Sequence, residues 1–292
     1  MPTRQELRAA IAAATAPRET APAPDAVAPA SLSRVTMLRR PTAATSDGDA
    51  GPGSAPTGRV SAVILAGGSG SRFTGSFIPK QFVQVHGKPI LAYVLETYQN
   101  LALIDDITLV INARYEQLYY DIVDTYKFFK VRHMVHGGPS RQGSAAAGIA
   151  SLERCDIVVM QDGVRPFTSQ RVIMEAVEMA RRVGGANVVV RTLDTIVEVK
   201  DGFIDRIPDR TYLYCGQAPQ VFQYELLVEA HRRAAAEGVS EASDDAQLVL
   251  KAGGRVGVVE GSYANFKITT YEDFVFASCM VEHEQFADGS KW

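Results

Sequence analysis

A glycine-rich turn that carries two basic residues is the first part of the chain whose residue types could do chemistry. Residues 63–80 read Val-Ile-Leu-Ala-Gly-Gly-Ser-Gly-Ser-Arg-Phe-Thr-Gly-Ser-Phe-Ile-Pro-Lys. Glycines let the backbone approach a ligand closely, and the inward-pointing amides of such a turn suit phosphate oxygens. Arg72 and Lys80 add the fixed positive charge that a polyphosphate needs. The segment therefore predicts a nucleotide-binding loop.

Two common nucleotide-binding motifs do not match this loop. A dinucleotide fingerprint needs G-x-G-x-x-G, and Phe73 stands where the third glycine would follow Gly68 and Gly70. A Walker A loop needs a lysine directly after its last glycine, and no lysine has that spacing here. Glycine-rich turns also follow strands for purely conformational reasons, so the loop alone leaves the function open.

Five further segments place polar or charged residues beside strand-like runs: 137–144, 161–167, 193–195, 209–210 together with 216–220, and 265–269. Because each follows or ends such a run, they could converge on one rim of a sheet. Asp162 comes directly after an apolar run, which is a natural place for a magnesium-binding carboxylate, since Mg²⁺ takes one or two carboxylates and completes its shell with water and phosphate. The alternative role of Asp162 is a helix N-cap or turn former.

Strand-like and helix-like segments alternate from Arg59 onward, which predicts an α/β fold with a mostly parallel sheet covered on both faces. We expect strands at 60–65, 107–111, 157–160, 187–190 and 256–259, and helices at 89–98, 143–152, 171–183 and 224–237. The alternation breaks where two strand-like runs, 195–200 and 203–207, flank Asp201-Gly202, which is typical of a hairpin turn. Because a lone two-stranded ribbon is marginally stable, we expect this arm to pack on another subunit.

Composition and charge exclude several classes of function. The net charge of −3 gives no electrostatic case for a nucleic-acid or membrane partner. No uninterrupted apolar stretch approaches the roughly 18 residues that a membrane span needs. The three cysteines are widely spaced, which suits reduced thiols in a cytoplasmic protein and offers neither a disulfide framework nor a zinc site.

Residues 1–57 differ from the rest because they are crowded with Ala, Pro, Ser and Gly. Such a segment cannot bury enough apolar surface to offset the entropy of ordering, so we predict a disordered tail there. It lacks the apolar core of a secretory signal. We place one folded domain at 58–280, with the arm at about 192–220, and a C-terminal tail at 281–292.

Taken together, the motifs between about residues 60 and 277 resemble those of the cytidylyltransferases that activate sugar-alcohol phosphates with CTP. The resemblance implies a Rossmann-like α/β nucleotidyltransferase with a twisted sheet, a projecting β-hairpin arm, a homodimer formed through that arm, and Mg²⁺ as cofactor. It implies nucleotide contacts from Ala66, Gly67, Gly68, Gly70, Gly138, Arg141 and Ser144. It further implies catalytic roles for Arg72, Lys80 and Lys267, a magnesium ligand in Asp162, and recognition of the substrate phosphate by Thr195 and Arg210, which would reach the neighbouring subunit's site.

The implied mechanism needs no general base. A phosphate oxygen of the sugar-alcohol phosphate attacks the α-phosphorus of CTP, and pyrophosphate leaves. Since that nucleophile is already ionised at neutral pH, positive groups only have to screen the approaching anions and stabilise charge in the transition state. His133 and His136 therefore need no catalytic role.

The sugar alcohol itself is open to two assignments. Segments 162–167, 194–198 and 214–220 look more like the ribitol-phosphate enzymes, so we expect transfer of CMP to D-ribitol 5-phosphate, giving CDP-ribitol. The alternative substrate is 2-C-methyl-D-erythritol 4-phosphate (MEP), of isoprenoid precursor synthesis. The MEP enzymes tend to carry an alanine where this chain has Gly163, no Gly-Gln pair before the Pro-Gln, and an acid in place of Ala264.

Two functions of other classes compete with these. A non-catalytic nucleotide-binding protein is disfavoured because Arg72, Lys80, Asp162 and Lys267 are all present. A dehydrogenase is disfavoured by Phe73 in the glycine loop.

Overall fold

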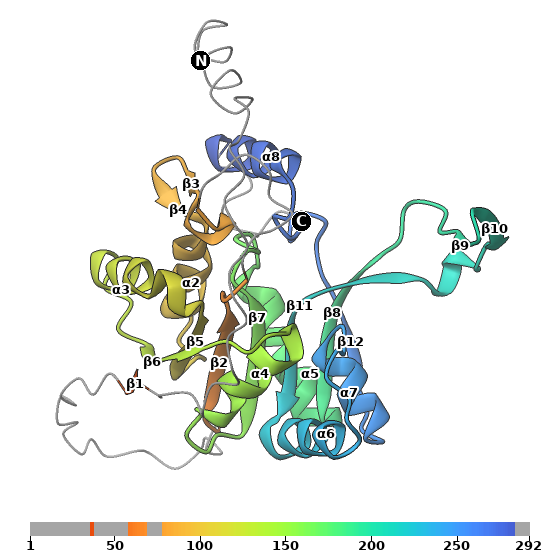
Figure 1. Ribbon diagram of the computed structural model, residues 1–292, viewed down its shortest axis with the longest axis horizontal. Coiled ribbons are helices and arrows are strands. Elements are labelled where there is room, and N and C mark those ends of the chain that lie inside the picture. Colours follow the sequence, from red (N-terminus) through yellow and green to blue (C-terminus); the bar gives the residue numbers. More distant parts are fainter. Residues whose placement is uncertain (1–35, 38–57, 69–77, 284–292) are drawn as a thin grey trace, which may run out of the picture. The chain divides into compact units, whose positions relative to one another are not determined.

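An eight-stranded sheet forms the centre of the part of the chain that the computed structural model describes, residues 36–37, 58–68 and 78–283 (Figure 1). Its strand order is β1-β6-β5-β2-β7-β11-β8-β12. The bounds are β1 Thr36–Met37, β2 Val60–Leu65, β5 Asp106–Ile111, β6 Val131–His136, β7 Ile157–Asp162, β8 Gly185–Arg191, β11 Tyr214–Gln223 and β12 Gly257–Glu260. Apart from β1, the tail predicted at 1–57 lies outside the described residues.

The sheet is mostly parallel, as the sequence predicts. Strand β2 runs parallel to β5 and β7, β5 parallel to β6, and β8 parallel to β12. Strand β11 is the exception among the long strands, because it lies antiparallel between β7 and β8. The sheet therefore has the Rossmann-like α/β architecture that the sequence predicts.

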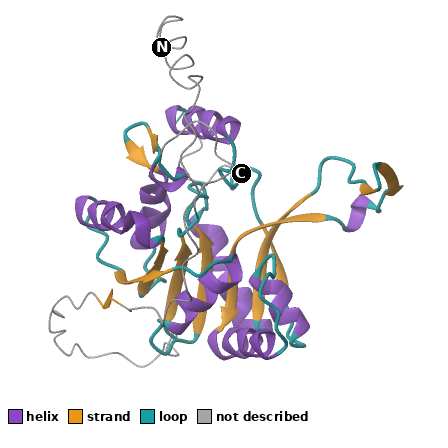
Figure 2. Ribbon diagram, viewed as in Figure 1, coloured by secondary structure: helices purple, strands orange, loops and turns teal. Residues whose placement is uncertain are grey.

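Helices cover both faces of the sheet (Figure 2). Alternate side chains of β2 point to opposite faces: Ile64 joins the apolar core under α2, α3 and α5, whereas Val63 joins the core under α4, α6 and α7. The helix bounds are α2 Ile90–Asn100, α3 Glu116–Thr125, α4 Arg141–Ala150, α5 Gln170–Val183, α6 Tyr224–Ala236, α7 Asp245–Lys251 and α8 Tyr271–Glu282. No helix in the described ranges is both long and apolar enough to cross a membrane.

The strand order reverses direction at β2, which places a crevice there. From β2 the chain adds β5 and then β6 on one side, and it returns to add β7 on the other side. In the parallel register, Leu65 at the end of β2 stands beside Asp162 at the end of β7. Ligands of open α/β sheets bind at such a switch point, outside the carboxyl ends of the strands. The glycine loop and Asp162 therefore meet where the fold favours a ligand.

A two-stranded arm projects from the sheet between β8 and β11 (Figure 1). It consists of β9 Glu198–Lys200 and β10 Phe203–Arg206, which pair in antiparallel fashion. The turn between them has positive φ at both central residues, 51° at Asp201 and 84° at Gly202, as a tight hairpin turn requires. The predicted hairpin is confirmed, although its first strand begins at Glu198. A smaller hairpin, β3 Gln84–Val85 with β4 Lys88–Pro89, precedes α2.

Several elements escaped the sequence-based expectations, namely β6, β11, α3, α7 and α8. Strand β11 contains Gly216 and Pro219, two residues that interrupt a strand pattern, and its pairing with β8 shifts register between Gly216 and Gln220. Helix α8 continues to Glu282, so the boundary expected at residue 280 falls inside it.

Helix α4 lies unusually close to the sheet because Gly148 faces it. A Cβ at this position would lie 2.5 Å from Val63 Cγ1 and 2.8 Å from Val110 Cγ2, both on fully buried side chains. We expect Gly148→Ala to destabilise the protein by about 1–2 kcal/mol, because overpacking costs more than the roughly 1 kcal/mol gained in helix propensity. Urea unfolding measures this change.

A double-mutant cycle with Val63→Ala separates the clash from other effects. Since Val63→Ala removes the nearer of the two methyl groups that the new methyl group would meet, the two substitutions together should cost less than the sum of their separate costs. Additive costs would contradict the close approach.

Candidate active site

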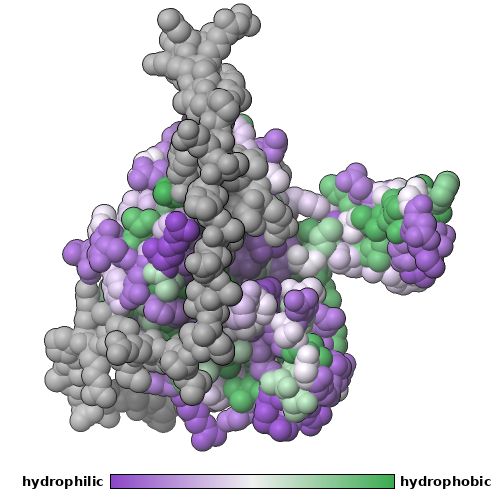
Figure 3. All heavy atoms as spheres, viewed as in Figure 1, coloured by the Kyte–Doolittle hydropathy of each residue, from purple (hydrophilic) through white to green (hydrophobic). Residues whose placement is uncertain are grey.

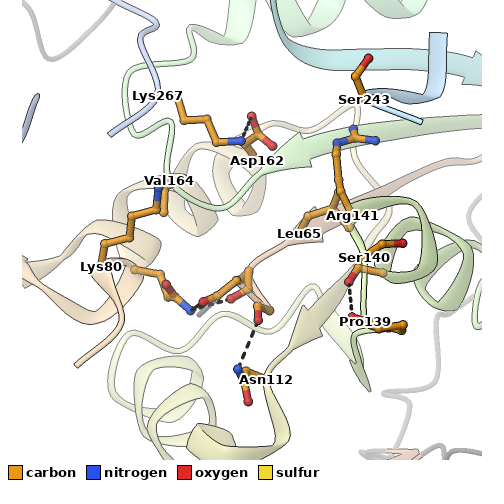
Figure 4. Close-up of a pocket in the computed structure, with 16 residues that line it drawn as sticks. Leu65, Lys80, Asn112, Pro139, Ser140, Arg141, Asp162, Val164, Ser243 and Lys267 are labelled. Carbon is orange, nitrogen blue, oxygen red and sulfur yellow. Dashed lines mark hydrogen bonds and ion pairs between the residues drawn. The ribbon is translucent and has the colours of Figure 1, made fainter. Parts of the chain in front are cut away.

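A cavity of about 660 Å³ opens at the carboxyl ends of the central strands (Figure 4). Its lining includes the end of β2, the loop before α4 and the end of β7. Of the residues predicted from the sequence, it brings together Ala66, Gly67, Gly68, Lys80, Gly138, Arg141, Ser144, Asp162 and Lys267. Residues that are far apart in the chain therefore converge on one site.

Four predicted residues are not placed at this cavity. Gly70 and Arg72 lie outside the described residues. Thr195 and Arg210 belong to the arm, are exposed, and do not line the cavity. Their predicted contact with the substrate phosphate would need another subunit.

Three neighbouring side chains hold the start of the glycine loop in place, and two of them, Gln81 and Tyr119, are buried. The carbonyl oxygen of Ala66 accepts hydrogen bonds from Gln81 Nε2 at 2.7 Å and from the Tyr119 hydroxyl at 2.6 Å. Gln81 also donates to the Gly68 carbonyl at 3.1 Å, and Asn112 Nδ2 donates to the Gly67 carbonyl at 3.3 Å. Because Gln81 directly follows Lys80, the same anchor fixes the lysine's backbone beside the loop.

Close backbone contacts explain two of the glycines without any ligand. A Cβ at Gly67 would lie 3.2 Å from the carbonyl oxygen of Ile111, and one at Gly138 would lie 2.8 Å from the carbonyl carbon of Gly143. Backbone atoms cannot swing aside as a side chain can, so a side chain at either position would push these segments apart. Gly67 thus allows the glycine loop to lie against the end of β5, and Gly138 allows the loop after β6 to lie against α4, in the wall of the cavity.

Helix α4 begins at this wall with Arg141. Its N-cap is Ser140, whose hydroxyl accepts a hydrogen bond from the backbone N–H of Gly143 at 3.0 Å. One turn into the helix, the Ser144 hydroxyl donates to the Gly138 carbonyl at 3.3 Å, joining two residues that were predicted to contact the nucleotide.

Asp162 lies between two cationic side chains. Lys267 Nζ is 3.2 Å and Arg165 Nε is 3.0 Å from the same oxygen, Oδ2 (Figure 4 shows the lysine contact). The Asp162 side chain is only 15% exposed. Burial would raise its pKa, but the charges of Lys267, Arg165 and Arg141 outweigh burial and hold the pKa below its ordinary value. Asp162 is therefore ionised at neutral pH.

A buried polar chain sets the position of the Lys267 loop, and Asn265 is its centre. Asn265 is 2% exposed, and its Nδ2 donates to the Ala218 carbonyl at 2.7 Å. Its Oδ1 accepts from the Thr168 hydroxyl at 2.9 Å, and its backbone carbonyl accepts from Arg165 Nη1 at 2.8 Å. Asn265 thus ties the loop of Lys267 to the loop of Asp162 and to strand β11.

The sequence analysis assigned no role to Gln81, Asn112, Arg165 or Asn265. Arg165 and Asn265 stand inside segments that were singled out, three residues after Asp162 and two before Lys267. Their closeness to Asp162 and Lys267 in sequence was the only indication of a role. Side chains that hydrogen-bond to distant backbone groups leave no recurrent pattern in a single sequence. Gln81 had no signal beyond its place after Lys80.

The arrangement suits the binding of a polyphosphate. Lys80, Arg141 and Lys267 bring positive charge to a cavity whose floor is a glycine loop. Within the described ranges no cluster of three or more His, Cys, Asp or Glu side chains could hold a metal ion by itself. Mg²⁺ needs no such cluster, since it takes one or two carboxylates and completes its shell with water and phosphate oxygens.

Comparison with known families gives a match over nearly all of the described domain. Residues 60–283 match the family model described as IspD: 2-C-methyl-D-erythritol 4-phosphate cytidylyltransferase. A 2-C-methyl-D-erythritol 4-phosphate cytidylyltransferase of Clostridium acetobutylicum is 38% identical over 223 residues, which are 76% of this chain and 96% of that protein. One of Caldanaerobacter subterraneus is 40% identical over 221 residues, with 75% and 96% covered.

Comparison with solved structures gives the same family. The crystal structure of 4-diphosphocytidyl-2C-methyl-D-erythritol synthase from Anaerococcus prevotii superposes with a TM-score of 0.69 at 30% identity, covering 77% of this chain and 97% of that one. A 2-C-methyl-D-erythritol 4-phosphate cytidylyltransferase from Thermus thermophilus gives a TM-score of 0.63 at 31% identity, with 77% and 99% covered.

These findings contradict the expectation of D-ribitol 5-phosphate, because the family model and these relatives carry the name of the MEP enzyme. Of the segments weighed for ribitol, 162–167 contributes Asp162 and Val164 to the cavity lining, whereas Gly163 and the segments 194–198 and 214–220 lie outside it. Gln217 is buried and donates to the Ser262 carbonyl at 2.9 Å, and a Cβ at Gly163 would pack 3.0 Å from Ala66 Cβ. These positions reflect local packing, so they were poor guides to the substrate.

The Asn265 side chain gives a test of the buried polar chain. We expect Asn265→Ala to lower the free energy of unfolding by about 2–3 kcal/mol, because it removes the partners of the Ala218 carbonyl and the Thr168 hydroxyl inside the protein. Denaturant unfolding measures the loss. The same substitution at exposed Asn100 should change stability by less than about 0.5 kcal/mol. Equal effects at both sites would contradict a structural role for Asn265.

Proposed function

The chain belongs to the 2-C-methyl-D-erythritol 4-phosphate cytidylyltransferase family, and we propose that it transfers the CMP group of CTP to 2-C-methyl-D-erythritol 4-phosphate with release of pyrophosphate. The chain is a CTP-dependent nucleotidyltransferase, as the sequence predicted. The observation that carries the choice of site is the contact between Lys267 and Asp162, 3.2 Å apart in a cavity floored by the glycine loop.

In the proposed reaction, a phosphate oxygen of MEP attacks the α-phosphorus of CTP. The new bond joins this oxygen to the α-phosphorus, and the bond from the α-phosphorus to the bridging oxygen breaks, so that pyrophosphate leaves. Lys267 neutralises charge at the α-phosphate, and Lys80 holds the departing phosphates beside the loop. Lysine suits both positions because a point charge on a flexible stem follows a moving oxygen. No group in this scheme has to remove a proton.

Mg²⁺ is part of the proposal, and Asp162 fits its requirements. Lys267 and Arg165 both contact Oδ2, so Oδ1 is the oxygen that can meet a cation. One carboxylate suffices for Mg²⁺ when phosphate oxygens and water complete the octahedron. When bound, the ion would draw charge from the triphosphate. The ionised state of Asp162 at neutral pH supports this role.

The proposed active form is a homodimer joined through the arm. Apolar side chains gather on the arm (Figure 3), among them Phe203 at 78% and Tyr212 at 80% exposure. Apolar side chains exposed together favour a protein interface. In such a dimer Thr195 and Arg210 of one subunit would complete the other's cavity, with the Arg210 guanidinium gripping the MEP phosphate.

A non-catalytic nucleotide-binding protein and a dehydrogenase both fit poorly. Lys80, Asp162 and Lys267 line one cavity together, and a binding protein would not need the set. The family to which the chain belongs consists of transferases, and the dinucleotide fingerprint is incomplete at Phe73.

A side-by-side assay tests the substrate. We expect the purified protein with CTP and Mg²⁺ to release pyrophosphate rapidly with MEP and at most at background rate with D-ribitol 5-phosphate. Replacing Mg²⁺ by a chelator should abolish the release. Turnover of ribitol 5-phosphate in preference to MEP would overturn the proposal, as would CTP binding without turnover of either compound.

Mixing two inactive variants tests the shared site. Lys267→Ala and Arg210→Ala should each lower kcat roughly a hundred- to a thousand-fold, because each removes a positive group from the transition state. If Arg210 serves the partner's cavity, an equal mixture after subunit exchange should recover about a quarter of the wild-type activity, since half the dimers are mixed and each of those keeps one intact site. Arg206→Ala on the same arm is the control. No recovery in a mixture that native mass spectrometry shows to contain mixed dimers would place Arg210 in its own chain's site.

A further inference from the structure

Arg141 stands at a helix position that is electrostatically unfavourable for it. It is the first residue of α4, where the positive end of the helix dipole repels a cation. It nevertheless lines the cavity, and its side chain extends from α4 toward Ser243 (Figure 4). The positive charge of Arg141 therefore does not stabilise α4, and a negatively charged group must offset its repulsion by the helix dipole.

The compensating group is Asp245, the first residue of α7. Its carboxylate is completely buried, and Oδ2 lies 2.9 Å from Nη2 of Arg141. The other oxygen, Oδ1, lies 2.9 Å from Nε2 of His231, which comes from α6 and is 9% exposed. Helices α4, α6 and α7 thus bring an arginine, a histidine and a carboxylate into contact, and the arginine lines the cavity.

Asp245 is also fixed through its backbone. Gln220 Oε1, on strand β11, accepts hydrogen bonds from the backbone N–H groups of Asp245 at 3.0 Å and Ala246 at 3.4 Å. The start of α7 is thereby pinned to the sheet. A carboxylate held at both its backbone and its side chain is a rigid support for a flexible arginine.

The carboxylate of Asp245 is ionised at neutral pH. Burial would raise the pKa of Asp245, but the hydrogen bond from His231 and the charge of Arg141 hold it below its ordinary value. A buried carboxylate without partners destabilises the folded state strongly, and this cost favours the conformation in which Arg141 contacts Asp245. Among the described residues Nη1 of Arg141 has no hydrogen-bond partner, so the orientation of the guanidinium depends on the contact with Asp245.

We propose that Asp245 is a positioning residue for nucleotide binding, which acts by holding the Arg141 guanidinium at the wall of the cavity, and that His231 keeps Asp245 in place by donating to its second oxygen. This rests on the proposed function only in taking CTP as the nucleotide. Asp245 itself touches no ligand in this scheme. Its effect on CTP passes entirely through Arg141.

Binding of Mg-CTP by calorimetry, followed by steady-state kinetics, tests the proposal. Asp245→Asn keeps the shape of the side chain but removes its charge. We expect the Kd and KM for CTP to rise roughly tenfold or more, because a charge-assisted contact to a binding residue is lost. The kcat and the KM for the polyol phosphate should change less than about twofold, because Lys267 and Asp162 keep their contact.

Asp244→Ala is the matched control for damage to α7. Asp244 is the N-cap of the same helix and accepts the N–H of Gln247 at 2.9 Å. Its loss should cost about 1 kcal/mol of stability while leaving the ion pair to Arg141 intact. We expect the Kd for CTP to stay within about twofold of wild type. If the Kd for CTP rises in both variants in proportion to their loss in free energy of unfolding, Asp245 matters only for folding. That result would overturn the proposal.

Two further measurements separate positioning from structure. In an Arg141→Ala background, Asp245→Asn should add less than about twofold to the Kd for CTP, and a full tenfold addition would overturn the proposal. At position 231, His231→Gln retains a donor near Nε2 and should bind CTP almost as well as wild type, whereas His231→Leu should not. Equal binding by both would remove His231 from the proposal, and wild-type binding by Asp245→Asn would refute it entirely. Failure of the wild type to bind CTP would instead refute the proposed function.

Discussion

The ion pair between Lys267 and Asp162 is the constraint on which the site depends. Its two charges come from the end of strand β7 and from a loop that is distant in sequence, and both are positioned by the rest of the fold. Parallel pairing of β2 with β7 brings Asp162 beside the glycine loop, and Asn265 brings Lys267 to Asp162 through contacts to β11. The Lys267 loop could not hold this geometry alone, because it lies outside regular secondary structure, whereas Asp162 is fixed as the last residue of β7.

The charges of the site are arranged before any ligand arrives. Asp162 is flanked by Lys267 and Arg165, and Arg141 is matched by buried Asp245, so these charges have counter-charges within the protein. Charges that are already oriented need no reorganisation when negative charge develops on a phosphate, which is the main electrostatic advantage of an enzyme over water. The cost of desolvating these groups was met during folding by the apolar cores on both faces of the sheet.

Sequence reasoning could predict those features that depend on neighbouring residues. The bounds of β2, the turn at Asp201-Gly202 and the convergence of glycine loop, Asp162 and Lys267 all follow from local patterns. Strand β11 could not be predicted, because its Gly and Pro residues interrupt the alternation of apolar and polar residues that marks a strand. The pairing of β11 with β8, including its shift in register, depends on the folded sheet. The Asn265 contacts could not be foreseen either, since their partners are backbone carbonyls and a hydroxyl that only the folded chain brings near.

The mistaken substrate has a related physical origin. The nucleotide side of the cavity is built within one chain from loops in which Gly67 and Gly138 pack closely against backbone atoms, so the fold itself constrains these residues. Thr195 and Arg210 stand on an exposed arm, where side chains can change without disturbing the sheet or the triphosphate loop. The loop motifs therefore identified the cytidylyl transfer, whereas the residues around β11, which are shaped by packing, and the exposed arm gave weaker information about the sugar alcohol.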